Sequence, residues 1–62
     1  MKLVIEIQMD NAAFAEYASC EVSRILIELA TRYYEQGEHS EQITLRDING
    51  NKVGFARVVS DE

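Results

Sequence analysis

The shortness of the chain, combined with the lack of any staple for its core, limits most strongly what it can fold into. It has 62 residues, of which 47% are apolar. A domain of this size buries only about 60% of the surface that its unfolded chain exposes, so burial barely offsets the entropy of folding. Cys20 and His39 are the only cysteine and histidine, which leaves no internal disulfide and argues against a zinc site. We therefore expect one domain over residues 1–62, stabilised by forming a homodimer.

The composition also excludes several classes of protein. Almost half of the residues can enter a core and only 27% are charged, which argues against a disordered chain. No apolar run approaches the roughly 18 residues that span a membrane. The first six residues lack the apolar stretch and cleavage site of a signal peptide. We therefore expect a cytoplasmic protein that does not bind membranes.

Two regular elements are predicted in the first part of the chain. Apolar and mostly polar residues alternate over residues 2–9 and predict a strand with one covered face, and the polar pair that follows offers a helix N-cap. Residues 12–36 contain no Pro or Gly and carry apolar residues at helical spacing, which predicts a helix that ends before Gly37. Ser19 is an alternative N-cap, so the helix could also begin after it, with residues 14–18 forming a separate turn.

A β-hairpin is predicted over residues 43–59, around Asn49-Gly50. A two-residue turn would mix polar and apolar side chains on one face of the hairpin. A three-residue loop of residues 48–50 avoids this, and it places Asp47 and Gly50 at the turn positions that favour Asp and Gly. We prefer the second register, which gives the pairs Leu45 with Val53 and Ile43 with Phe55.

These elements predict an α+β fold in the order β-α-β-β, with one long helix on one face of a three-stranded sheet that ends in a C-terminal hairpin. A helix between the first strand and the hairpin suggests a crossover with one parallel neighbour, and the strand order stays open. The expected helix stripe is Val22, Ile25, Leu26, Leu29 and Tyr33. The expected sheet side of the core is Leu3, Ile5, Ile7, Ile43, Leu45, Val53 and Phe55.

The helix is more apolar than one small sheet requires. Its apolar and small residues cover an arc of about 200°, roughly twice the stripe that a sheet needs. The surplus residues predict a surface for self-association or for a partner. This predicted interface consists of Cys20, Ile27, Ala30 and Tyr34. A second candidate interface is the sheet, by stacking of its outer face or by pairing of edge strands across a two-fold axis.

The sequence offers no constellation of catalytic residues. Nucleophilic catalysis needs a nucleophile, a base and an orienting group, but Cys20 and His39 are expected near opposite ends of the helix. The stretch from Glu38 to Glu41 is expected to be a solvated loop, and the glutamates include no obvious buried acid pair. No phosphate-binding, zinc-protease, calcium-binding or paired-cysteine motif is present. We expect no enzyme and no catalytic, cofactor-binding or metal-binding residues.

A small basic spot is the only sign of nucleic-acid binding. In the preferred register Arg46 and Lys52 are cross-strand neighbours, and Arg57 or Lys2 could extend them. Binding to phosphates requires such a footprint. The net charge of -5 argues against it, so Arg46, Lys52 and Arg57 stay an alternative contact surface.

Three segments resemble short uncharacterised proteins of bacteriophages and prophages. They begin at Met9 (MDNAAF), Glu21 (EVSRIL) and Leu45 (LRDINGNKVG). That family has no assigned activity, so the resemblance implies no functional residues. It implies a phage context in the cytoplasm of a host cell. By analogy with other small acidic phage proteins, a host protein is then a further candidate partner, including inhibition of a defence system such as a CRISPR complex.

Overall fold

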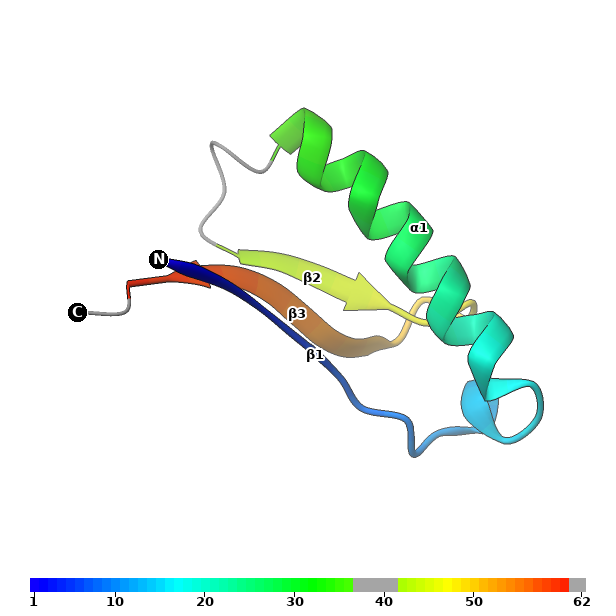
Figure 1. Ribbon diagram of the computed structural model, residues 1–62. Coiled ribbons are helices and arrows are strands. Elements are labelled where there is room, and N and C mark those ends of the chain that lie inside the picture. The colour runs from blue at the N-terminus through cyan, green and yellow to red at the C-terminus, as the bar shows by residue number, and fades with distance from the viewer. Residues whose placement is uncertain (37–41, 61–62) are drawn as a thin grey trace.

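One helix lies over one face of a three-stranded antiparallel sheet in the computed structural model, which describes residues 1–36 and 42–60 (Figure 1). This confirms the predicted α+β fold and its element order. The predicted helix end at Gly37 and the polar loop around His39 lie outside the described residues. The elements are β1 (Lys2–Ile7), the 3-10 turn η1 (Ala12–Phe14), α1 (Ala18–Gln36), β2 (Gln42–Arg46) and β3 (Lys52–Val59).

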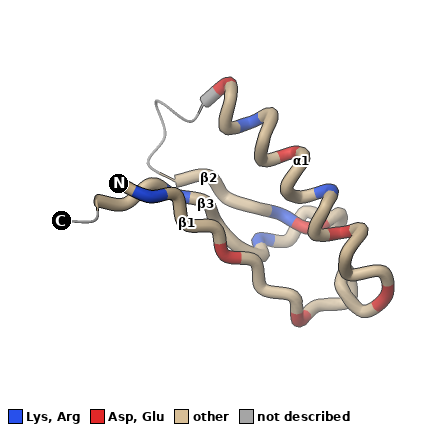
Figure 2. The backbone as a smooth tube through the Cα atoms, in the orientation of Figure 1, with Lys and Arg blue, Asp and Glu red and all other residues tan. Residues whose placement is uncertain are grey.

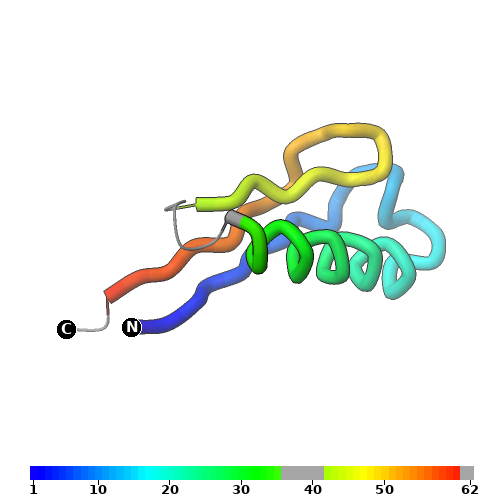
Figure 3. The backbone as a smooth tube through the Cα atoms, turned by 90° about the horizontal axis from the view of Figure 1, so that it is seen from above, coloured from blue at the N-terminus to red at the C-terminus, as the bar shows by residue number. Residues whose placement is uncertain are grey.

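The strand order is β1-β3-β2, and both neighbouring pairs are antiparallel (Figure 3). Because β1 and β2 each run opposite to β3, they point in the same direction, and α1 is the crossover between them. However, β3 is inserted between these two strands, so the expected parallel neighbour is wrong. Insertion of the hairpin's second strand leaves β1 and β2 as the two edges of the sheet.

The chain between β1 and α1 forms one separate 3-10 turn and not the first part of a long helix. Asn11 caps η1, and its side-chain oxygen accepts a hydrogen bond of 2.9 Å from the N–H of Ala13. Tyr17 then adopts a left-handed conformation with φ 56°, which no helix interior accommodates. The helix therefore begins at Ala18, and a start at Ala12 is wrong. The alternative with a separate short turn is closer to the structure.

The hairpin loop has the predicted three residues, 48–50. Gly50 has φ 87°, its N–H donates to the carbonyl oxygen of Asp47 at 3.0 Å, and the N–H of Asp47 donates to the oxygen of Asn51 at 2.9 Å. Beyond the loop the predicted register is wrong, because a β-bulge between Leu45 and Arg46 adds one residue to β3. The observed pairs are Arg46 with Lys52, Leu45 with Gly54, and Ile43 with Ala56.

The bulge exchanges the faces of most of β3. Phe55 lies opposite Thr44 and Glu6, on the face away from the helix, and not in the core as expected. Gly54, Ala56 and Val58 lie on the helix side, whereas a core position for Phe55 implied the outer face for them. Gly54 can occupy its position because it has no side chain. A Cβ atom there would overlap the main-chain carbonyl oxygen of Glu6.

The core is small and lies at the end of the molecule where α1 begins. It consists of Phe14, Ile25, Leu29, Ile43, Leu45, Val53 and Ala56. The helix rises away from the sheet toward its C-terminal end (Figure 1). Leu3 and Ile5 were expected in the core but are 46% and 42% exposed, and Leu26 of the helix stripe is 40% exposed. The wedge between α1 and β1 therefore leaves apolar side chains uncovered.

Candidate interaction surfaces

Asp47 is the centre of a buried polar cluster in the hairpin loop. Its carboxylate accepts hydrogen bonds of 2.9 Å from the N–H groups of Asn49 and Asn51, and a further one from the side chain of Asn51. The side chain of Asn11 donates to it at 2.7 Å. Burial alone would raise the pKa of Asp47, but these hydrogen bonds outweigh it and lower the pKa below its usual value. The loop is thereby joined to the start of η1.

Glu21 forms the second half of this cluster, in the first turn of α1. Its carboxylate accepts 2.8 Å hydrogen bonds from Nε of Arg24 and from the N–H of Ile48. The hydrogen bond from Arg24 is the main reason that the pKa of Glu21 is lowered. This buried acid pair was not predicted, because Glu21 and Asp47 lie far apart in the chain.

The hydrogen bonds of Glu21 and Asp47 serve to hold the fold together. Among the described residues, no buried side-chain nitrogen or oxygen lacks a hydrogen-bond partner. Two carboxylates that accept several hydrogen bonds and carry lowered pKa values are poor proton acceptors. The described part of the chain also holds no group of three or more His, Cys, Asp or Glu residues that could bind a metal. This cluster therefore positions the helix start, η1 and the hairpin relative to one another.

The polar side of α1 carries alternating acidic and basic residues (Figure 2). Glu28 lies 3.3 Å from Nη1 of Arg24 and 3.7 Å from Nη1 of Arg32, and both are ion pairs between residues four positions apart on the helix. Both arginines also reach the main chain of β2. Such a mixed face offers no continuous acidic surface to a basic partner.

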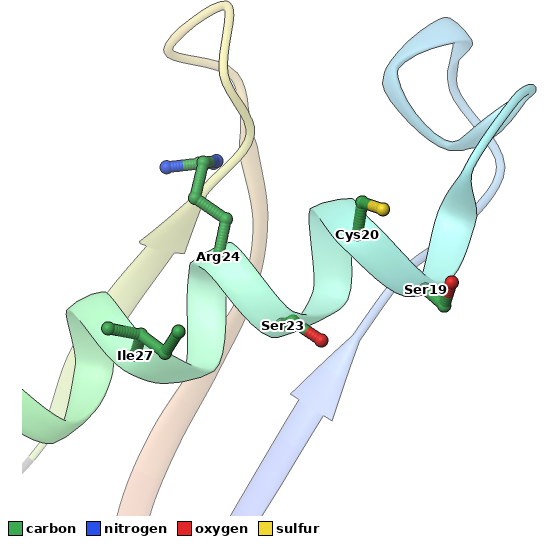
Figure 4. Close-up of a pocket in the computed structure, with 5 residues that line it drawn as sticks. All are labelled: Ser19, Cys20, Ser23, Arg24 and Ile27. Carbon is green, nitrogen blue, oxygen red and sulfur yellow. The ribbon is translucent and has the colours of Figure 1, made fainter.

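The four residues of the predicted interface are all exposed, but they belong to more than one surface. Ile27 and Tyr34 are 69% and 92% exposed. Cys20 and Ile27 line a shallow depression on the outer side of α1, together with Ser19, Ser23 and Arg24 (Figure 4). Ala30 instead borders a groove on the side of α1 that faces β1. The structure thus separates Cys20 and Ile27 from Ala30.

The groove between α1 and β1 was not expected from the sequence. It has a volume of about 300 Å³ and is lined only by apolar and aromatic residues: Leu3, Ile5, Leu26, Leu29, Ala30 and Tyr33. The helical and strand periodicities had assigned most of these side chains to the core. Periodicity identifies the face on which a side chain lies, but it does not tell how far the opposite layer extends over it.

The outer face of the sheet brings together the basic residues of the strands. Arg46 and Lys52 are cross-strand neighbours, as predicted, and the register also places Lys2 and Arg57 on this face. The guanidinium of Arg57 lies 5.3 Å from the ring centre of Phe55. Glu6 is the only acidic residue of the described strands on the same face. Four of the six Lys and Arg residues are therefore gathered on one surface of an acidic protein.

Comparison with protein-family models, with curated proteins and with solved structures finds no match for the chain. In the described residues, no helix combines the length and the apolar character needed to cross a membrane. The surfaces described above are therefore the basis for assigning a function.

Proposed function

We propose that the protein acts by binding other protein chains, as a homodimer, and that it does not catalyse a reaction. The observation that carries this proposal is the uncovered apolar surface on the helix side of the sheet. It includes Leu3, Ile5 and Leu26 at the groove between β1 and α1, and it is flanked by the exposed Ile27 and Tyr34 on the outer side of α1. Exposed apolar residues gathered in this way are typical of interaction sites.

The size of the exposed surface supports a protomer rather than a free monomer. A compact monomer of 7.1 kDa exposes about 4,100 Å², whereas this chain exposes 4656 Å². Its radius of gyration is 12.2 Å, against about 10.6 Å for a compact domain of this length. A stable dimer buries about 800 Å² on each partner. The exposed area of the chain is large enough to bury such an interface, and its small core would be stabilised by the burial.

The same proposal covers where the protein acts and which other partner it could meet. The resemblance to phage proteins favours the cytoplasm of a bacterial host, and a host protein would use the same apolar surface. Inhibition of a host defence system would be one consequence of such binding. A second copy of the chain is the favoured partner, because the small core of each chain gains stability from it.

Measurement of molar mass by light scattering, over protein concentrations from about 1 to 100 µM, tests this function. We expect the mass to rise from one chain toward two chains. Ile27→Glu and Tyr34→Glu would show whether the outer side of α1 contributes. A mass of one chain throughout this range, unchanged in both variants, would refute self-association.

The outer sheet face supports a second candidate function, the binding of single-stranded nucleic acid. Arg46, Lys52 and Arg57 lie there with Lys2, and Phe55 offers a ring on which a base could stack. The net charge of -5 opposes phosphate binding at long range. We therefore rank this function below protein binding.

Fluorescence anisotropy with a labelled oligonucleotide tests the second candidate. Contacts to phosphates are strongest at low salt, so binding at about 50 mM salt is the most sensitive condition. Arg57→Glu should abolish any binding that uses this face, and Arg32→Glu on α1 is the matched control. Lack of binding at low salt removes this candidate function.

A further inference from the structure

The two edge strands of the sheet, β2 and β1, differ in whether side chains of α1 cover their outer main-chain groups. Along β2, two arginines of α1 cover outward-facing carbonyl oxygens. Nη1 of Arg32 donates to the oxygen of Thr44 at 2.8 Å, and Nη2 of Arg24 donates to the oxygen of Arg46 at 3.1 Å. No described side chain is hydrogen-bonded in this way to the outer edge of β1, which is the first strand of the sheet (Figure 3). A bare edge is a template for another strand.

The hydrogen-bond pattern shows which residues of β1 face this edge. The N–H of Gln8 donates to the carbonyl oxygen of Val53 at 2.7 Å. Residues along an antiparallel strand point their main-chain groups alternately to one neighbour and the other. The main-chain N–H and C=O groups of residues 2, 4 and 6 therefore point toward β3, whereas those of Leu3 and Ile5 point outward.

The bare edge is continuous with the apolar groove. Leu3 and Ile5 supply both the outward main-chain groups and the apolar side chains that line the groove below α1. An added strand at this edge would therefore gain main-chain hydrogen bonds and apolar contacts at once, which is how strand addition achieves affinity.

The structure assigns this edge to a second copy of the chain. Resting on the self-association proposed above, we propose that β1 pairs antiparallel with β1 of the partner subunit, with Val4 on the two-fold axis. Leu3 then lies opposite Ile5 of the partner subunit, and their main-chain groups are hydrogen-bonded. Lys2 lies opposite Glu6 of the partner subunit on the outer face. The two three-stranded sheets become one continuous sheet with both helices on the same side.

Charge complementarity selects this register. With Val4 on the axis, each Lys2 meets a Glu6, and opposite charges directly across a strand pair are stabilising. A two-fold axis at Ile5 would place Lys2 opposite Gln8 and Glu6 opposite Val4, which leaves both charges without a partner across the interface. Since a two-fold contact repeats every pair, the preference counts twice.

Exchange of the two charges tests the register. Lys2→Glu places two glutamates opposite each other, and Glu6→Lys places two lysines opposite each other. We expect each single variant to dimerise at least about tenfold more weakly than the wild type. An equal mixture of the two variants should form heterodimers again, and the double variant Lys2→Glu/Glu6→Lys should restore the homodimer. Undiminished dimerisation of both single variants would overturn the proposal.

A cross-link tests the position of the axis without disturbing the charges. Val4→Cys, made together with Cys20→Ser, places two cysteines opposite each other at a pair without hydrogen bonds, where Cα atoms lie about 4.5 Å apart and a disulfide fits. We expect rapid covalent dimers on mild oxidation. Thr44→Cys in the same background is the control, because Thr44 is also partly exposed on the outer face but lies on β2. It should stay monomeric on the same gel.

The outcomes separate this inference from the proposed function. A mass of two chains together with efficient Val4→Cys cross-linking supports both. A mass of two chains that is lost in Ile27→Glu or Tyr34→Glu, with no cross-link at residue 4, overturns the pairing of β1 but leaves self-association standing. A single chain at every concentration overturns both.

Discussion

Gly54 lies where the main chains of β3 and β1 leave no room for a side chain. A side chain at this position would overlap the carbonyl oxygen of Glu6 and approach Cα of Ile7 to 3.0 Å. Both contacts are with main chain, which cannot rotate away. We expect Gly54→Ala to lower the free energy of unfolding by about 3 kcal/mol or more, measured by urea denaturation.

Gly50 provides the matched control for this variant. Its φ of 87° is unfavourable for alanine, but nothing lies within 4 Å of the position of an added Cβ atom. Gly50→Ala should therefore cost only the backbone strain, about 1–2 kcal/mol. If Gly54→Ala costs no more than Gly50→Ala, then β1 and β3 do not approach as closely as described.

Asp47 and Glu21 make the stability of the protein dependent on pH. The pKa values of both carboxyl groups are lower in the folded chain, so protonation favours the unfolded state. Their stabilisation is fully present above their unfolded pKa values near pH 4, and it is lost as the pH falls through the lower values of the folded state. We expect the urea midpoint to fall steeply below about pH 4.

Variants of the cluster locate the origin of this acid sensitivity. Asp47→Asn should lower the midpoint at pH 7 and flatten its dependence on acid. Asn11→Ala removes one hydrogen bond to the Asp47 carboxylate, which raises its pKa and shifts the loss of stability to higher pH. If the urea midpoint of Asp47→Asn falls at low pH as steeply as that of the wild type, other groups cause the acid sensitivity.

At the scale of elements, the features that depend on residues close together in the sequence were predictable. Asp47 and Gly50 identified the three-residue loop, because both residue types satisfy a particular turn. The strand and helix periods identified the faces. The bulge at Val53 was not predictable in this way, because it depends on how three strands pair and not on the turn residues. The bulge moved Phe55 to the outer face. The strand order, which the sequence left open, and the wrongly expected parallel neighbour depend on tertiary pairing in the same way.

The candidate sites show the same division between local and tertiary information. The exposure of Ile27 and Tyr34 was predictable, because a helical wheel places them outside the core stripe. The bare edge of β1 and the groove beside it were not. They depend on which strand lies at the edge and on how far α1 rises from the sheet, and neither follows from the spacing of apolar residues.

At the scale of the whole molecule, an open protomer makes stability depend on concentration. A dimer that forms only from folded chains stabilises them by mass action, so the thermal midpoint should rise with protein concentration. Both Leu26 and Leu29 border the groove, but they separate this effect from folding itself, because Leu29 is buried in the core whereas Leu26 is 40% exposed. Leu29→Ala should cost about 2–5 kcal/mol at every concentration.

Leu26→Ala should behave differently, because its side chain is 40% exposed in the single chain and lies in the surface that a second copy would cover. We expect little change in the thermal midpoint of a dilute sample and a smaller rise with concentration than in the wild type, measured by calorimetry. If Leu26→Ala lowers the midpoint equally at all concentrations, the groove contributes to folding and not to assembly. If the wild-type midpoint is independent of concentration, the protomer is stable without a second copy, which contradicts self-association.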